Sequence, residues 1–249
     1  MDGYRIAGDM HTHTSVSQHA YSTIAENIEY TKRQGLEFLG WTDHGPEMMD
    51  GAIAHHFLCM NSLPMMMEGI RVFKGAEVNI KSFGGRVDLP DSTLSFMEWV
   101  IASYHVEAID PGTKEENTEG WLNVIRNPFI DCIGHPGNMA YDCDHETVVK
   151  ALKEYGKVLE VNSNSFAIRK GSTESCSDLI RLCKKYDVPV VATSDAHIMY
   201  RVGDVQESLN LLRELEYPAE RILNSSRKSI EYFIEARSME KRESTRNRK

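Results

Sequence analysis

A short apolar run followed by an amphipathic stretch recurs seven times along this chain. The runs have the length of a strand and are rich in β-branched or aromatic residues, and several follow a turn-forming glycine, proline or aspartate. They span residues 4–10, 38–42, 72–80, 99–104, 129–134, 158–161 and 188–193. Near-continuous apolar runs are typical of strands covered on both faces, as in a parallel sheet. The alternation predicts an α/β fold, and seven units favour a closed barrel over an open sheet.

Helix signals lie between most of these runs. Thr23 and Glu26 can form a capping box, and Asp144 is a second candidate N-cap. Apolar residues at helical spacing indicate further helices over 176–183, 205–212 and 230–234.

We expect one barrel domain over residues 1–249, because this length suits a single large domain and no low-complexity linker divides the chain. The basic stretch 241–249 is expected to form a flexible, solvated tail. Residues 47–64, which contain His55 and His56, are expected to form a long loop, either a cap over a pocket or a plain surface loop.

Charge and composition argue against several classes of protein. The 37 acidic and 28 basic residues give a net charge of −9, which argues against a general duplex-DNA binder. No apolar run reaches the ~18–20 residues of a membrane span, and the start of the chain shows no secretory leader. The five cysteines include no C-x-x-C pair and are expected to be reduced thiols. A cytoplasmic protein is therefore expected, and the sequence gives no prediction of its oligomeric state.

Histidines and carboxylates gather at the ends of these runs. They occur at six of the seven: His11, His13 and His19 with the first, His44 with the second, Glu77 within the third, His105 and His135 after the next two, and Asp195 and His197 after the last. In a parallel barrel the carboxyl ends of the strands meet on one face, so we expect these side chains to form one patch.

The residue types in this patch indicate metal binding. Alternate residues of a strand point the same way, so the imidazoles of His11 and His13 can bind one ion, and Asp195 and His197 repeat the spacing. A lone histidine is more often structural than a ligand, but seven histidines and two carboxylates exceed the needs of one ion. They favour two or three divalent ions of zinc, manganese or iron.

The combined motifs resemble the PHP (polymerase and histidinol phosphatase) family, and within it the YcdX-like phosphatases. The motifs are H-x-H-T-x-x-S at 11–17, T-D-H at 42–44, the later glutamate and single histidines, and S-D-x-H at 194–197. The resemblance spans roughly residues 9–235 and implies a distorted, TIM-like (β/α)7 barrel with the metal site at the carboxyl ends of its strands. The one departure is a short extension, residues 1–8, before the first strand.

This resemblance also implies a ligand set for three ions. His11, His13, Glu77 and Asp195 hold one ion, Glu77 bridges to a second held by His105 and His135, and His19, His44 and His197 hold a third. Zinc is the usual metal, and family members also use iron or manganese. Every ligand position is filled in this sequence, which implies an active enzyme.

A site with three divalent ions and few carboxylates predicts a cationic pocket that attracts a phosphate group. The expected reaction is hydrolysis of a small phosphomonoester by a metal-activated hydroxide, with Glu77 and Asp195 as its ligand carboxylates. Asp43 is expected to orient a ligand imidazole from behind. Arg169 is either a clamp that holds two phosphate oxygens or an ordinary surface arginine.

Three other functions are alternatives. A 3′–5′ nuclease of the same family, acting on single-stranded nucleic acid, needs similar metals, but the net charge and the absence of a polymerase domain argue against it. A metal-dependent amidohydrolase also opens with H-x-H, but Tyr104 and His105 stand where it usually has a modified lysine. A non-catalytic metal or phospholigand module is the third. The sequence does not choose among histidinol phosphate, nucleotides, sugar phosphates and phosphotyrosine peptides as substrates.

Overall fold

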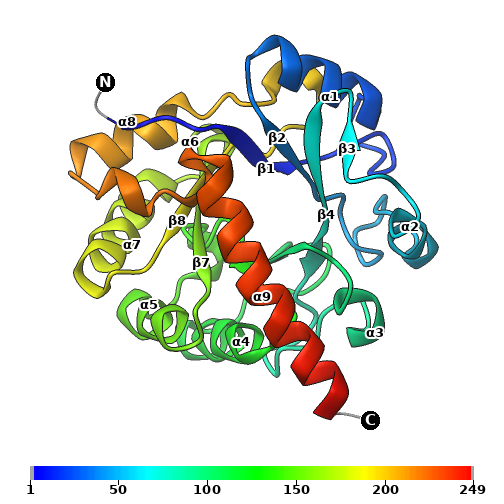
Figure 1. The fold of residues 1–249 in the computed structure, drawn as a ribbon. Coiled ribbons are helices and arrows are strands. Elements are labelled where there is room, and N and C mark those ends of the chain that lie inside the picture. Colours follow the sequence, from blue (N-terminus) through cyan, green and yellow to red (C-terminus); the bar gives the residue numbers. More distant parts are fainter. Residues whose placement is uncertain (1–2, 248–249) are drawn as a thin grey trace.

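In the computed structural model, which describes residues 3–247, seven parallel strands curl into a barrel in the order β1-β2-β4-β5-β6-β7-β8 (Figure 1). Their bounds are β1 Gly8–Thr12, β2 Phe38–Trp41, β4 Ile70–Asn79, β5 Trp99–Ser103, β6 Cys132–Ile133, β7 Val158–Asn162 and β8 Val190–Thr193. A further short strand, β3 (Met66–Met67), pairs antiparallel with β4. The predicted α/β barrel is confirmed, and each parallel strand overlaps one of the seven predicted runs.

The barrel closes between β1 and β8 without a regular ladder. Near the carboxyl ends of these strands, the backbone N–H of His13 donates to the carbonyl oxygen of Ala196 at 2.8 Å. Nearer the other ends, the side chain of Asn224 lies between them. Its Nδ2 donates to the carbonyl oxygens of Gly8 at 2.9 Å and Ala192 at 2.7 Å. One buried amide therefore satisfies backbone groups that the two strands do not satisfy for each other.

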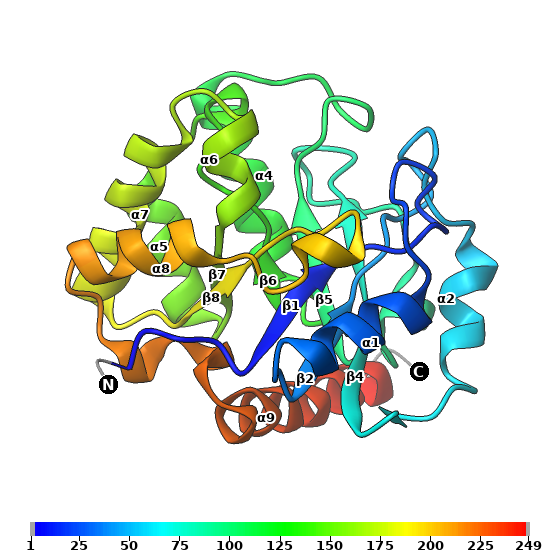
Figure 2. The same ribbon diagram turned by 90° about the horizontal axis from the view of Figure 1, so that it is seen from above.

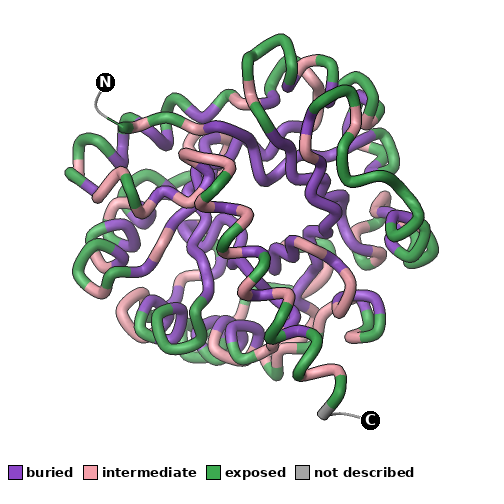
Figure 3. Tube along the Cα trace, viewed as in Figure 1, coloured by how far each residue is buried: buried purple, intermediate pink, exposed green. Residues whose placement is uncertain are grey.

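Helices surround the barrel, and buried backbone forms its inner ring (Figure 3). Their bounds are α1 Ile24–Arg33, α2 Ala54–Met60, α3 Asp91–Leu94, α4 Lys114–Arg126, α5 His145–Glu154, α6 Ser163–Ile168, α7 Ser172–Tyr186, α8 Gln206–Glu214 and α9 Arg227–Asn247. Thr23 and Glu26 make both bonds of the predicted capping box, and Asp144 caps α5 as predicted. Within the described residues, none of these helices is both long and apolar enough to cross a membrane.

The segment 47–64 is not an unbroken loop, because α2 lies within it. No side chain caps the start of α2, so the local sequence carries no start signal. The helix is instead stabilised by burial of Phe57 and Met60, as is usual for helices too short to be stable alone. The prediction of a loop was wrong here because tertiary packing, and not local propensity, decides the conformation.

The last helix, α9, covers the amino-terminal opening of the barrel (Figures 1 and 2). Its Ile230 and Ile234 pack in one cluster with Phe38, Phe73 and Trp99, which point into the barrel from three strands. The catalytic end of such a barrel is the opposite one, so α9 closes the end that is not used for binding.

The prediction of a flexible tail over 241–249 was wrong for residues 241–247, which belong to helix α9. Helix α9 continues to Asn247, and Lys241 is buried with an exposed fraction of 1%. Lys241 Nζ lies 2.5 Å from Asp131 Oδ2, and Arg237 Nε lies 3.1 Å from Asp131 Oδ1. A buried carboxylate thus compensates two cations, of which Lys241 lies in the stretch that was predicted to be solvated. Residues 248–249 lie outside the described residues.

A second buried lysine in this region predicts a pH-dependent stability. Lys157 Nζ donates to the carbonyl oxygens of Ile130 at 2.5 Å and Asn127 at 3.0 Å. Burial, helped by the nearby Arg237, lowers its pKa to about 7. The unfolded chain then binds more protons than the folded chain between that pKa and the usual lysine value, so stability rises with pH in this window.

We expect the free energy of unfolding to rise by about 2 kcal/mol from pH 7 to pH 9 on account of this residue. Urea unfolding of the wild type and of Lys157→Met at each pH measures it. The difference between the two proteins isolates Lys157 from the other titrating groups. Identical pH dependence in both proteins would show that the ammonium keeps an ordinary pKa.

Candidate metal centre

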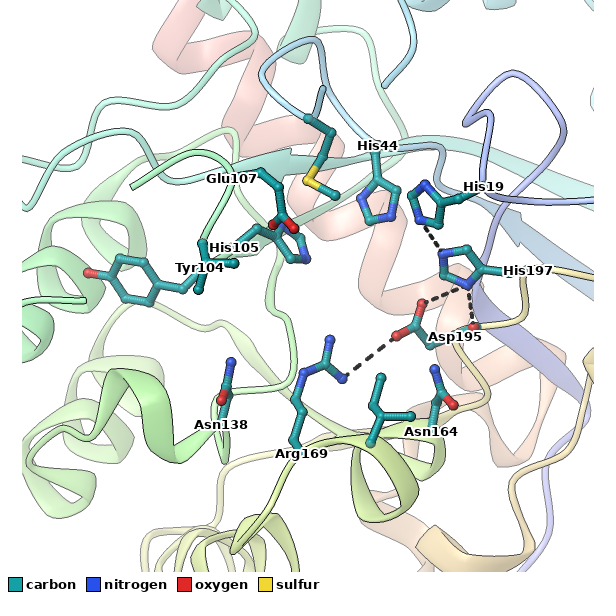
Figure 4. Close-up of a pocket in the computed structure, with 13 residues that line it drawn as sticks. His19, His44, Tyr104, His105, Glu107, Asn138, Asn164, Arg169, Asp195 and His197 are labelled. Atoms are coloured by element: carbon teal, nitrogen blue, oxygen red, sulfur yellow. Dashed lines mark hydrogen bonds and ion pairs between the residues drawn. The ribbon is translucent and has the colours of Figure 1, made fainter. Parts of the chain in front are cut away.

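All nine predicted ligands lie at the carboxyl ends of the barrel strands. Contacts of 3.6 Å or less connect every member of the set to at least one other member. They lie around and beneath a pocket of about 400 Å³, whose lining residues are drawn in Figure 4. The pocket wall includes His19, His44, His105, Asp195 and His197. The other four ligands are buried beneath it and are called the lower layer: His11, His13, Glu77 and His135.

Glu77 is the centre of the lower layer. Its side chain points into the site from β4, and its residue is fully buried. Oε2 lies 2.8 Å from His44 Nδ1 and 3.3 Å from His11 Nε2, while Oε1 lies 3.0 Å from His135 Nε2. Ser103 Oγ donates to Oε1 at 2.6 Å, which fixes the rotation of the carboxylate.

Asp195 is the second carboxylate of the set. Its Oδ1 lies 3.1 Å from His13 Nε2 and 3.6 Å from both His11 Nε2 and His197 Nδ1. The backbone of Asp195 has φ +54°, and that of His135 has φ +33°. Residues other than glycine rarely adopt this left-handed region, and such strain is typically stored at functional sites.

Several buried polar atoms at this centre have no hydrogen-bond partner. They are His11 Nε2, His13 Nδ1, His44 Nδ1 and Glu77 Oε2. Unpaired buried polar atoms are costly, and a cluster of lone pairs without protons between them is what a cation satisfies. The donor atoms also gather closely enough to share ions. Within the described residues, three groups have donor atoms within 4.8 Å of one another: His11, His13 and Asp195; His13, His44 and His197; His44, Glu77 and His105.

These groups agree with the implied ligand set in part. His11, His13 and Asp195 fall together, as do His44 and His197, and Glu77 falls with His105. The difference is that His13 and His44 each belong to two groups. His19 and His135 belong to none of the three, but they contact His197 and Glu77 respectively.

Charges and burial within the cluster shift the pKa of its side chains in both directions. Burial opposes ionisation of Glu77, but the imidazoles of His11 and His44 outweigh it and hold the pKa of Glu77 well below its usual value. Burial, and then the charge of neighbouring imidazoles, lowers the pKa of His13 well below the usual range. Burial likewise lowers the pKa of His105. Burial opposes the charge of His11 and His44, but the neighbouring carboxylates outweigh it and raise the pKa of both rings. Divalent metals bind ionised carboxylates and neutral imidazoles, so metal binding would displace these protons.

Sequence reasoning missed Glu160, a fully buried carboxylate on β7. Its Oε1 lies 2.5 Å from His11 Nδ1 and accepts a hydrogen bond from Thr193 Oγ1 at 2.6 Å. Its Oε2 accepts from the backbone N–H of His135 at 2.6 Å. Glu160 therefore orients one ligand and the backbone of another. The signal was present, because Glu160 interrupts an apolar run just as Glu77 does.

Asp43 does not orient an imidazole of the ligand set. Its Oδ1 accepts from the backbone N–H of Thr14 at 2.7 Å and from Ser17 Oγ at 3.1 Å, and its Oδ2 accepts from Trp41 Nε1 at 2.6 Å. The imidazole beside it is His56 of α2, whose Nε2 lies 3.2 Å from Oδ2. The carboxylate thus fixes the loop after β1, because it accepts hydrogen bonds from both Thr14 and Ser17 of that loop.

Arg169 reaches the pocket from the end of α6. Its Nη1 donates to Ser165 Oγ at 2.8 Å and lies 4.0 Å from Asp195 Oδ2. Figure 4 shows the guanidinium facing the pocket between Asn138 and Asp195. His55 and His56 do not belong to the pocket lining among the described residues.

Comparison with known proteins agrees with this geometry. Residues 9–168 match the PHP domain family. A protein of Acetivibrio thermocellus named "Probable phosphatase" is 42% identical over 226 residues, which cover 91% of this chain and 94% of that protein. A protein of Caldanaerobacter subterraneus subsp. tengcongensis, also named a probable phosphatase, is 42% identical over 233 residues, with 93% and 92% covered.

Among solved structures, this chain resembles the histidinol phosphate phosphatase of Lactococcus lactis complexed with zinc, L-histidinol and phosphate. The TM-score is 0.59, with 18% identity over 85% of this chain and 92% of that one. At this identity the likeness supports the barrel fold.

Proposed function

The chain belongs to the PHP domain family, and we propose that it is a metal-dependent phosphomonoesterase that acts on a small phosphorylated substrate. Its relatives confirm the family and the class of enzyme that the sequence predicts, a hydrolase of phosphoric esters. The observation that carries the finer proposal is the convergence of nine ligand-type side chains at and beneath one pocket, with four buried polar atoms that make no hydrogen bond of good geometry.

We propose three ions for this site, held by the ligand set that the resemblance implies. Contacts between His135 and Glu77 at 3.0 Å and between His19 Nε2 and His197 Nε2 at 2.9 Å support the two subsites nearest the pocket. Zinc suits a set rich in imidazole, and the Lactococcus lactis structure contains zinc. Bound divalent ions would activate water as a nucleophile and neutralise charge on the phosphoryl oxygens.

The chain's own residues prepare the pocket for a phosphoryl group. Glu77 and Asp195 stay ionised, yet three divalent ions would leave the site with a net positive charge despite the acidic protein around it. Arg169 adds a guanidinium that can hold two phosphate oxygens. On the leaving-group side, the wall offers apolar Val106 and Ile168 and the carboxylate of Glu107. This wall supports a small leaving group without further phosphates.

The clamp role of Arg169 predicts a selective effect on substrate binding. Arg169→Met is expected to raise KM for a phosphomonoester roughly 10- to 100-fold, because charged hydrogen bonds to phosphate contribute about 1.5–3 kcal/mol. Steady-state kinetics and inhibition by inorganic phosphate measure it. Arg201→Met, at an exposed arginine paired with Asp204, is the matched control. An unchanged KM in Arg169→Met would identify Arg169 as an ordinary surface arginine.

The proposed function is tested by metal content and turnover of the untagged protein. Plasma mass spectrometry should find close to three divalent ions per chain. The zinc- or manganese-loaded protein should hydrolyse small phosphomonoesters, tested with 4-nitrophenyl phosphate, histidinol phosphate, glycerol phosphate and a nucleoside monophosphate. One ion or fewer, not restored by added metal, would contradict the metal assignment. Hydrolysis of a single-stranded oligonucleotide alone would favour the nuclease, and full loading without turnover would favour a binding module.

A further inference from the structure

The candidate ligands fall into two classes by exposure. Residues of the lower layer, such as His11, His13 and Glu77, are fully buried. The side chains of His19 and His197 are 38% and 24% exposed at the mouth of the pocket. An ion held at the mouth therefore exchanges with solvent more readily than an ion held in the lower layer.

The two exposed imidazoles face each other with atoms that can bind a metal. Nε2 of His19 and Nε2 of His197 lie 2.9 Å apart (Figure 4). His197 Nδ1 lies 2.9 Å from the carbonyl oxygen of Asp195, which can only accept a hydrogen bond. His19 Nδ1 lies 2.8 Å from Asp50 Oδ2, which also accepts. Each ring therefore turns Nδ1 to an acceptor and Nε2 to the other ring, and a proton on Nδ1 leaves Nε2 as the nitrogen that could bind a shared ion.

Asp50 contacts the segment that contains His19 through its backbone as well as its side chain. The carbonyl oxygen of Asp50 accepts from the backbone N–H of Gln18 at 3.0 Å, next to the bond between its carboxylate and His19. The segment 45–52 that contains Asp50 is closed on itself, since the N–H of Ala52 donates to the carbonyl oxygen of His44 at 3.0 Å. This segment therefore connects two candidate ligands, His44 in sequence and His19 through Asp50.

The backbone of segment 45–52 is tightly packed at Gly51. A Cβ on Gly51 would lie 2.2 Å from the carbonyl oxygen of Gly45, so only glycine fits without a shift. The N–H of Gly51 donates to the carbonyl oxygen of Met48 at 3.0 Å, and Met48 lines the pocket. Asp50 is thus placed by a tight turn whose other side forms part of the pocket wall.

We propose that Asp50 is a positioning residue for the subsite of His19, His44 and His197, and that this subsite holds the exchangeable ion of the three. The inference rests on the proposed function. The subsite has three imidazoles and no carboxylate ligand of its own, so its affinity depends on how well the rings are held. The other two subsites have Glu77 and Asp195 as ligands, with Glu160 behind His11, and would bind their ions more tightly.

The experiment measures metal binding and not only turnover. Wild type, Asp50→Ala, Asp50→Asn and Glu47→Gln are loaded with zinc, freed of excess metal and analysed by plasma mass spectrometry. Release of zinc to a coloured chelator is then followed in time. Glu47 is the matched control, because it is an exposed acid of the same segment that pairs with Lys81 and not with a candidate ligand.

We expect the wild type to release one ion of three faster than the others. Asp50→Ala should keep two ions where the wild type keeps three, with about 10- to 100-fold weaker affinity for the third. Asp50→Asn, which retains an acceptor for His19 Nδ1, should be intermediate, and Glu47→Gln should match the wild type. His19→Ala should lose the same ion, and adding Asp50→Ala to it should change nothing further.

The outcomes separate this inference from the proposed function. Asp50→Ala could keep three ions with wild-type release rates, or it could lose two or more ions. Either result would overturn the role of Asp50, and three ions in the wild type would still support the proposed site. One ion or fewer in the wild type would overturn the proposed function and this inference together. Circular dichroism of each variant shows that the barrel is folded when its metal is counted.

Discussion

Replacing Glu77 with glutamine is expected to lower kcat/KM by about 10³-fold or more and to remove most of the bound metal. Glutamine has the size and shape of glutamate, and Ser103 Oγ can still donate to its Oε1. The change therefore removes one negative charge from the centre of the site and leaves its packing intact. Several kcal/mol of catalysis come from bound metal, and each 1.36 kcal/mol corresponds to a factor of ten.

The reason for so large an effect is that four imidazoles converge on this carboxylate. His11 and His44 approach Oε2, and His105 and His135 approach Oε1. A neutral amide binds a divalent ion weakly, and its N–H groups would oppose both ions that Glu77 is proposed to share. We therefore expect the metal content to fall from about three ions to one or none.

Glu160→Gln is the matched control for this experiment. Glu160 is also a fully buried strand carboxylate, on β7, but it contacts Nδ1 of His11 and is not placed as a ligand. Loss of such a partner behind a ligand typically costs 10- to 100-fold, so the control should lose less activity and keep its ions. Wild-type metal content and kcat in Glu77→Gln would contradict the central role of Glu77. A larger loss in Glu160→Gln would make Glu160 the more important carboxylate.

The ligands could be found from the sequence because their signal is local. Each histidine follows a strand-length apolar run, and the geometry of a parallel barrel brings the ends of such runs together whatever the loops do. Glu77 stands out because a charge within an apolar run has no ordinary structural explanation. Glu160 carries the same signal, and was missed because no second ligand-type residue follows its run as a motif.

The partners of the ligands were harder to predict because they depend on loop conformation. Asp50 reaches His19 only through the closed turn of residues 45–52, and nothing in the sequence fixes that turn before the fold is known. Asp43 was assigned to a ligand imidazole because it precedes His44 in the sequence. Adjacent residues of extended chain point to opposite sides, so a residue next to a ligand in sequence is expected to point away from it.

The carboxyl-terminal helix was misread for a different physical reason. Lys241 lies in a run of charged residues, which normally remains solvated. Its partner, Asp131, lies 110 residues earlier in the chain at the start of β6. A pair so distant in sequence is visible only when the helix has been docked against the barrel.

That pair predicts the largest effect on stability. Asp131→Ala is expected to lower the free energy of unfolding by about 3–5 kcal/mol, because breaking a buried ion pair leaves its partner charged and unpaired. Asp131 is fully buried, and its Oδ2 also accepts from the backbone N–H of Val100 at 2.9 Å. The substitution removes the carboxylate that compensates Lys241 and leaves this N–H without its acceptor, while Arg237 keeps its ion pair with Glu240. Urea unfolding at pH 7 measures the loss.

Two further variants decide whether the charges are responsible. Asp131→Ala combined with Lys241→Met should recover part of the loss, because the double variant removes the stranded cation. Lys185→Met breaks the exposed pair with Glu146 and should cost at most about 1 kcal/mol. A loss below 1 kcal/mol in Asp131→Ala would show that water reaches this cluster. Helix α9 lies at the end of the barrel opposite to the ligands. The folded fraction of Asp131→Ala should therefore keep its metal content and kcat. This result would separate the stability of the barrel from the chemistry at its other end.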